Sequence, residues 1–155
     1  MRPIAIWVAL FVCFFARAAD ALQCSVSATP LAFGTYDPVS GPAAQSSGTL
    51  TVSCSNGPNA SYTIALNTGL SGSYFPRQMA SGADRLPYQL FTDPAHTLVW
   101  GDGSAGTSTL SDRMVIPPPR SRPVTRNYTI YGQIPGRLPV SPGSYTDVVT
   151  VTVTY

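Results

Sequence analysis

The sequence contains no lysine, no glutamate and only one histidine, His96. Its nine arginines and seven aspartates carry the side-chain charge, and charged residues make up only 10% of the chain. With so few titratable groups, the chain offers no recognisable set of nucleophile, base and orienting residue. We therefore expect no catalytic residues and no cofactor, and we predict that the protein is not an enzyme.

The acidic residues show no metal-binding pattern. Asp84, Asp93, Asp102 and Asp112 are the candidates for calcium ligands, but no loop places acids at alternate positions, as a tight calcium site requires. Aspartates in turns are the better explanation. His96 has too few soft ligands around it in the sequence to complete a zinc site. We expect no metal.

Residues that favour helices are scarce, whereas glycine, proline, serine, threonine and tyrosine dominate. The chain has 13 glycines and 15 prolines. This composition is typical of secreted all-β proteins. The net charge is only +2, and two of the arginines lie in the N-terminal segment discussed next. A charge this small argues against nucleic acid as a partner.

The N-terminus has the parts of a secretory signal peptide. Arg2 provides positive charge, residues 4–15 are apolar, and Ala16-Arg17-Ala18 matches a small-x-small cleavage site. The apolar run is about twelve residues long, short of the roughly twenty that span a bilayer, so a retained membrane helix is the weaker alternative. We expect a signal peptide over residues 1–18.

The rest of the chain is long enough for one domain with one core, which we predict over residues 19–155. A second small-x-small match, Ala19-Asp20-Ala21, leaves open a mature start at Leu22. The sequence does not decide between the two cleavage positions.

Cleavage would remove Cys13 and leave Cys24 and Cys54 as the only cysteines. Two cysteines allow a single pairing, and an oxidising compartment favours it. A bridge closing a loop of about thirty residues would contribute roughly 3–4 kcal/mol. Two free buried thiols are the alternative.

Several segments alternate apolar and polar side chains, as half-buried strands do. The inward-facing sets are Leu50, Val52 and Cys54, then Tyr62, Ile64 and Leu66, then Leu86, Tyr88 and Leu90. We predict strands within 48–54, 62–66, 86–92, 127–134 and 145–155, shorter extended segments at 24–27, 30–36 and 96–101, and a loop over 37–47. Such short strands, separated by turns, indicate an all-β sandwich.

The final segment, residues 145–155, has the most regular alternation. It places Val149, Val151, Val153 and Tyr155 on one face of a strand. If no other segment of the chain pairs with its free edge, the unpaired backbone groups are a template for a strand from another molecule. A core strand paired within its own chain is the ordinary alternative.

A proline-rich basic segment is the remaining candidate for recognition. Its arginines are Arg113, Arg120, Arg122 and Arg126. They have the charge to bind an acidic glycan or phospholipid, but a solvated loop is the simpler interpretation.

The glycosylation sequon occurs twice, at Asn59 and Asn127, but so short a pattern often matches by chance. We discount the second because it lies in a predicted strand.

A set of motifs, in this order and spacing, resembles the spore coat protein U domain family. The motifs are Cys24, Leu31-Ala-Phe-Gly-Thr-Tyr36, Leu50-Thr-Val-Ser-Cys54, Arg77 before Leu86-Pro-Tyr-Gln-Leu-Phe91, and Gly143-Ser-Tyr-Thr-Asp147 leading into the last strand. The resemblance implies a subunit of an archaic chaperone–usher pilus. It also implies an immunoglobulin-like sandwich that lacks its final strand.

By this resemblance, a periplasmic chaperone lends a strand, and the outer-membrane usher exchanges it for the N-terminal extension of a neighbouring pilus subunit. Val149, Val151, Val153 and Tyr155 become the acceptor wall, and a disulfide between Cys24 and Cys54 ties the first strand to the second. The expected function is surface attachment and biofilm formation, on the cell surface or after secretion, with a surface or glycan as a candidate receptor.

One feature departs from polymerising subunits of this kind, which have ten or more alternating residues before the first cysteine. Here we expect only about five after cleavage, which predicts a subunit that accepts a strand without donating one. A self-sufficient secreted spore-coat or carbohydrate-binding module is the alternative function.

Overall fold

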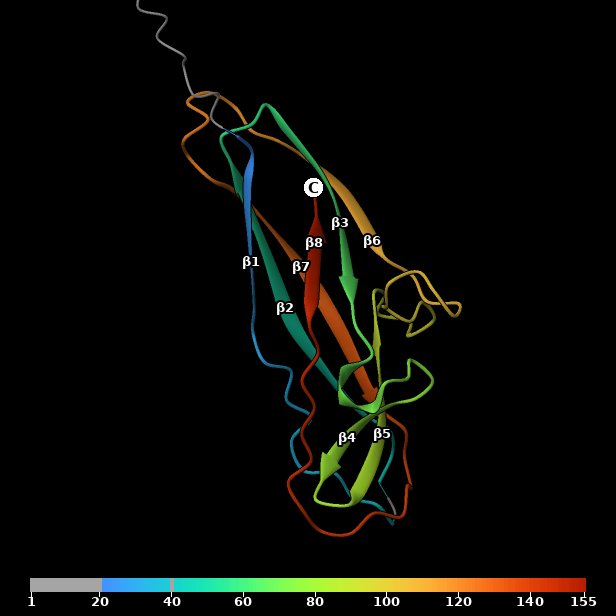
Figure 1. Cartoon of the computed structure of the whole chain (residues 1–155). Coiled ribbons are helices and arrows are strands. Elements are labelled where there is room, and N and C mark those ends of the chain that lie inside the picture. Colours follow the sequence, from blue (N-terminus) through green and yellow to red (C-terminus); the bar gives the residue numbers. More distant parts are fainter. Residues whose placement is uncertain (1–20, 40) are drawn as a thin grey trace, which may run out of the picture.

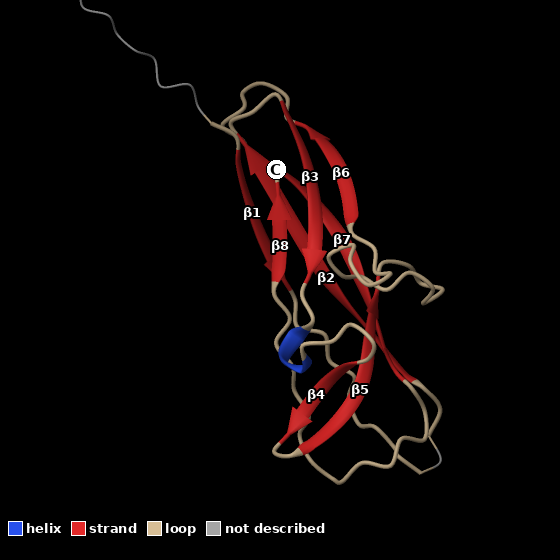
Figure 2. Ribbon diagram, turned by 45° about the vertical axis from the view of Figure 1, so that its right-hand side comes forward, coloured by secondary structure: helices blue, strands red, loops and turns tan. Residues whose placement is uncertain are grey.

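The computed structural model describes residues 21–39 and 41–155 as two antiparallel sheets packed face to face (Figures 1 and 2). The larger sheet has the strand order β1-β2-β7-β5-β4 and the smaller one β6-β3-β8. The strands are β1 Gln23–Ala28, β2 Ala44–Ser55, β3 Asn59–Leu66, β4 Arg77–Ser81, β5 Asp84–Phe91, β6 Leu110–Val115, β7 Val124–Ile134 and β8 Val151–Thr154. The predicted all-β, immunoglobulin-like sandwich is confirmed.

A short 3-10 helix, η1 (Gly69–Ser71), lies between β3 and β4. Among the described residues, no helix has the length and apolar character needed to cross a membrane. The expected signal peptide and both candidate cleavage sites lie outside the described residues.

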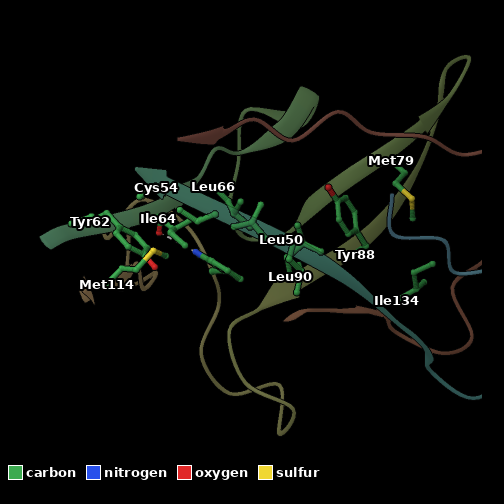
Figure 3. Packing of buried hydrophobic residues seen from close by; sticks show 14 of the residues in the cluster. Leu50, Cys54, Tyr62, Ile64, Leu66, Met79, Tyr88, Leu90, Met114 and Ile134 are labelled. Atoms are coloured by element: carbon green, nitrogen blue, oxygen red, sulfur yellow. Dashed lines mark hydrogen bonds between the residues drawn. The ribbon is translucent and has the colours of Figure 1, made fainter. Parts of the chain in front are cut away.

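The core lies between the sheets and is made by the alternating faces that the sequence predicts (Figure 3). Burial of these faces removes apolar surface from water, which is the main favourable term in folding. The three predicted inward sets are all buried: Leu50, Val52, Cys54, Tyr62, Ile64, Leu66, Leu86, Tyr88 and Leu90. The interior also contains Ala60, Tyr74, Met79, Phe91, Trp100, Met114, Ile116, Ile130 and Ile134.

Some strands differ from the prediction. β2 begins at Ala44, so the predicted loop over 37–47 is wrong for its last four residues. There the backbone of β2 continues its pairing with β7, from Ala44 opposite Ile134 onward, although the side chains are mostly small and polar. β4 and β6 were not predicted, and residues 96–101 make only isolated bridges, from Val99 and Trp100.

On one side of the sandwich, polar side chains join the two sheets. Asp112 of β6 accepts hydrogen bonds from the Tyr128 hydroxyl at 2.6 Å and from Arg126 at 3.0 Å, both on β7. The Tyr128 hydroxyl also bonds to that of Tyr62 on β3. The side where β6 faces β7 is therefore closed by a network that spans the gap between the sheets.

At the other end of β7, Gly132 provides space for the segment that follows β1. A Cβ atom at Gly132 would lie 2.8 Å from Phe33 Cζ and 2.9 Å from Leu31 Cδ2. The same segment is anchored by Tyr36, whose hydroxyl donates to Pro135 O and accepts from Leu138 N, both at 2.8 Å. Residues 31–36 thus lie against the larger sheet without forming a strand of it.

We expect the substitution Asp112→Asn to make the free energy of unfolding less dependent on pH. The Tyr128 hydroxyl, with help from Arg126, holds the pKa of Asp112 below its usual value. Such a carboxylate stabilises the fold above its unfolded-state pKa of about 4, and the contribution is lost as pH falls through the folded-state pKa. In urea unfolding at a series of pH values below about 6, Asp112→Asn should lose less stability on acidification than the wild type.

Asp84→Asn is the matched control, because the Asp84 carboxylate accepts no hydrogen bond from the described residues. It should retain the acid sensitivity of the wild type. Identical pH profiles for Asp112→Asn and the wild type would contradict a stabilising role for this network.

Candidate functional site

The opposite side of the sandwich has two strand edges that face each other without pairing. β1 has β2 as its only strand neighbour, and β8 has β3 as its only one, among the residues that the structure describes. Figures 1 and 2 both show β1 and β8 side by side, on different sheets. Each edge therefore retains a row of backbone groups that no neighbouring strand in the described chain satisfies.

The inner face of β1 is exposed to solvent. Val26 lies opposite Val52, and Ala28 lies opposite Leu50, so their side chains share the face that forms the core. Val52 and Leu50 are 0% exposed, whereas Val26 is 40% exposed. The core-facing side of β1 thus lacks the cover that its partner strand has.

The C-terminal segment faces this exposed surface. Val149, Val151 and Val153 are half-buried and pack against the core, as the alternation predicts, although the strand predicted over 145–155 forms only as β8, Val151–Thr154. Their neighbours Val148, Thr150, Thr152 and Thr154 are exposed on the other side. Tyr155, the fourth predicted member of the inner set, is 56% exposed.

A groove runs between these two edges. One part has a volume of about 360 Å³, and a second part of about 720 Å³ shares Leu31, Phe33, Met79 and Tyr145 with it. Its walls come from the segment after β1 and from the segment before β8, and its floor comes from both sheets. The residues of the first part are Ala28, Thr29, Pro30, Leu31, Phe33, Leu66, Met79, Tyr88, Leu90, Ile130, Tyr145, Thr146, Asp147, Val149 and Val151.

Hydrogen bonds hold the C-terminal wall of the groove in place. Asp147 accepts from the Tyr88 hydroxyl at 2.6 Å and from the Leu70 amide at 2.8 Å. Burial and this bond to Asp147 raise the pKa of Tyr88, so the hydroxyl remains a donor. The backbone of Thr146 pairs with Ala80 of β4 in both directions, at 2.8 and 3.0 Å. The wall is therefore fixed both by β4, through Thr146, and by the Tyr88–Asp147 bond, whose two residues line the groove.

Further along, Asn67 connects this wall to a buried arginine. Its side-chain oxygen accepts from the Thr150 backbone amide at 2.8 Å, and its backbone N–H donates to Thr150 O at 3.1 Å. Its carbonyl oxygen accepts from Arg77 Nε and Nη2, at 3.2 and 2.9 Å. Asn67 thus links Arg77 by hydrogen bonds to the segment that leads into β8.

Arg77 is 0% exposed and forms no ion pair among the described residues. Besides Asn67, it donates to Trp100 O at 2.6 Å and to Gln89 Oε1 at 2.8 Å, and its guanidinium lies 5.0 Å from the centre of the Tyr74 ring. Burial lowers its pKa. Carbonyl dipoles and an aromatic face thus take the place of a counter-ion.

A disulfide joins Cys24 of β1 to Cys54 of β2, as expected. The two residues lie directly opposite each other in the antiparallel pair. The bond fixes one end of the exposed strand β1 to the buried strand β2, so one edge of the groove is covalently attached to the core.

The other candidate residues do not assemble into a site. No group of three or more potential metal ligands lies together in residues 21–39 and 41–155. Arg113, Arg120 and Arg122 are exposed, while Arg126 pairs with Asp112. Both sequon asparagines lie in strands and are exposed: Asn59 begins β3, and Asn127 in β7 accepts a hydrogen bond from Thr51.

The second wall of the groove was not predictable from the sequence pattern. The predicted extended run over 30–36 gave no sign that Leu31 and Phe33 would line a space shared with Val149 and Val151. Only the order of strands brings these segments together. Arg77 was noted solely as part of a family motif, although its position just before a predicted strand was a usable signal.

Replacement of Arg77 by lysine should destabilise the fold. An ammonium group lacks the planar fork that reaches three acceptors, and each buried acceptor left unpaired costs about 1–3 kcal/mol. We expect Arg77→Lys to lower the free energy of unfolding by about 3 kcal/mol in urea titrations.

Arg85→Lys is the control, since Arg85 is exposed and bonds only to nearby carbonyls of its own turn. Its effect should stay within about 0.5 kcal/mol. Equal stabilities of the two variants would show that Arg77 does not organise this end of the molecule.

Comparison with known proteins gives a family and a fold. A family model described as Spore Coat Protein U domain matches residues 10–152. No curated protein matches the chain.

Among solved structures, the chain is similar to one in the crystal structure of the CsuC–CsuE chaperone–tip adhesion subunit pre-assembly complex, from archaic chaperone–usher Csu pili of Acinetobacter baumannii. The sequence identity is 24% and the TM-score 0.57. The similarity covers 87% of this chain and 40% of that chain, so it concerns the fold and less than half of the longer protein.

Proposed function

Because this chain belongs to the spore coat protein U domain family, we propose that it is a subunit of an archaic chaperone–usher pilus. Its groove between β1 and the C-terminal segment accepts a strand from another protein. The observation that carries this proposal is the exposed inner face of β1, which continues into a groove whose opposite wall contains the half-buried Val149 and Val151.

The groove has the chemistry that a β-strand donor requires. Leu66, Met79, Leu90 and Ile130 form an apolar floor, and the edges of β1 and β8 offer backbone groups on both sides. A donor with apolar side chains at alternate positions would fill the floor while its backbone bonded to the edges. Val149, Val151 and Val153 would form the acceptor wall, and Tyr155 would join it at the end of the strand.

The partners follow from this mechanism. In the similar structure, a tip adhesion subunit forms a pre-assembly complex with its chaperone. For this chain we propose a periplasmic chaperone as the first strand donor. An outer-membrane usher and neighbouring pilus subunits follow, after export directed by a signal peptide over residues 1–18. Surface attachment and biofilm formation are the proposed role of the assembled protein.

Urea unfolding with and without a donor peptide tests the mechanism. The peptide has apolar side chains at alternate positions, and a scrambled peptide of the same composition is the control. At a hundredfold excess over Kd, a ligand that binds only the folded state adds about 2.7 kcal/mol to the free energy of unfolding. We expect the urea midpoint of unfolding to rise when the donor peptide is added and to stay unchanged when the scrambled peptide is added.

Two neighbouring residues of β1 make a matched pair for this experiment. Val26 and Ser27 are both exposed, but only Val26 faces the groove side of the strand. Val26→Asp and Ser27→Asp should therefore have similar stabilities without peptide, and only Val26→Asp should lose the response. A stable wild type that ignores the peptide would instead indicate a self-sufficient secreted module.

A further inference from the structure

A small hollow on the outer face of the larger sheet shares no lining residue with the groove. Its volume is about 360 Å³, and it opens to solvent. It is lined by Gln45, Ser46, Ser47, Pro94, His96 and Tyr131. We propose that this hollow, called here the outer-face pocket, binds the ring of a neutral sugar.

Strand alternation places its polar groups on the outside of the sandwich. Ser47 lies directly opposite Tyr131 in the pairing of β2 with β7. The neighbours of Tyr131 in sequence, Ile130 and Gly132, are buried toward the core, so the Tyr131 side chain lies on the other face. Gln45 shares this outer face with Ser47, two positions away.

Of the polar side chains that line the pocket, only Ser46 forms a hydrogen bond with another described residue, by donating to Ala32 O at 2.6 Å. Among the described residues, the side chains of Gln45, Ser47, His96 and Tyr131 have no hydrogen-bond partner. Tyr131 is half-buried, and its unbonded hydroxyl distinguishes it from the other partly or fully buried tyrosines. Those all have bonded hydroxyls: Tyr36, Tyr62, Tyr74, Tyr88, Tyr128 and Tyr145.

A preformed loop holds His96 at the pocket. The Asp93 carboxylate accepts from the Leu98 amide at 2.7 Å, and from the amide and hydroxyl of Thr97 at 3.1 and 2.9 Å. His96 itself has a φ of 56°, in the left-handed region that residues other than glycine rarely adopt. Its ring packs edge to face against Phe91 and Tyr131, with centroids 5.0 and 6.3 Å away.

The chemistry of these groups selects the ligand class. An amide, two hydroxyls and an imidazole both donate and accept hydrogen bonds, which suits the hydroxyl groups of a sugar. Aromatic rings and Pro94 offer apolar contact to the C–H side of a pyranose. No arginine lines the pocket, and the Asp93 charge is already bonded within its own loop. The pocket therefore favours a neutral ring over a phosphate or a uronic acid.

The test is an NMR titration of the purified exported chain with methyl glucoside, methyl galactoside and N-acetylglucosamine. Glucuronic acid serves as the anionic comparison. We expect saturable amide shifts for residues 45–47, 95–98 and 131 with at least one neutral sugar. Tyr131→Phe and Gln45→Ala should each weaken that binding about fivefold, the effect of one lost hydrogen bond.

Thr129→Val is the control, because it removes a hydroxyl from the same outer face of β7 outside the pocket and should leave the affinity unchanged. Gln45 is exposed, so Gln45→Ala keeps the test decisive even if Tyr131→Phe disturbs the fold. The proposal is overturned by any of three results: no saturable binding, unchanged affinity in both pocket variants, or tighter binding of glucuronic acid.

Discussion

Three strands face five in this sandwich, and the hydrophobic space between the sheets must be covered along both of its long sides. Where β6 faces β7, the Asp112 network closes the gap. Where β1 faces β8, no described strand lies between the edges. The exposed Val26, the half-buried valines of the C-terminal segment and the groove itself all lie on this side, which no described strand covers.

The two walls of the groove are held by different means. β1 is attached to the buried strand β2 by a disulfide and a backbone ladder. The C-terminal wall also has backbone pairs, from β8 to β3 and from Thr146 to Ala80, but in place of a disulfide it has side-chain hydrogen bonds. Tyr88 donates to Asp147, and the Thr150 amide donates to the side chain of Asn67. These bonds position the valines, while no described strand pairs with the edge of β8 that faces β1. A rigid but unoccupied edge is what strand addition from another molecule requires.

Much of the fold could be predicted because burial imposes a period of two on the long strands. The inward sets in β2, β3 and β5 are the clearest cases, and the cysteine pairing followed from having only two cysteines to pair. β4 and β6 were missed because they are short edge strands with polar residues and so lack a clear apolar face. The valine wall was predictable from its own alternation. The opposite wall was not, because Leu31 and Phe33 line the groove only through the order of distant strands.

Gly132 shows how much of this architecture depends on one missing side chain. Leu31 and Phe33 approach the β7 backbone so closely that a methyl group there would meet both of them. The distance between the β7 backbone and residues 31–36 therefore depends on the absence of a side chain at Gly132. An alanine at this position would act as a wedge under residues 31–36, which are anchored by few backbone bonds. By displacing Leu31 and Phe33, it would change the width of the groove, although Gly132 itself does not line the groove.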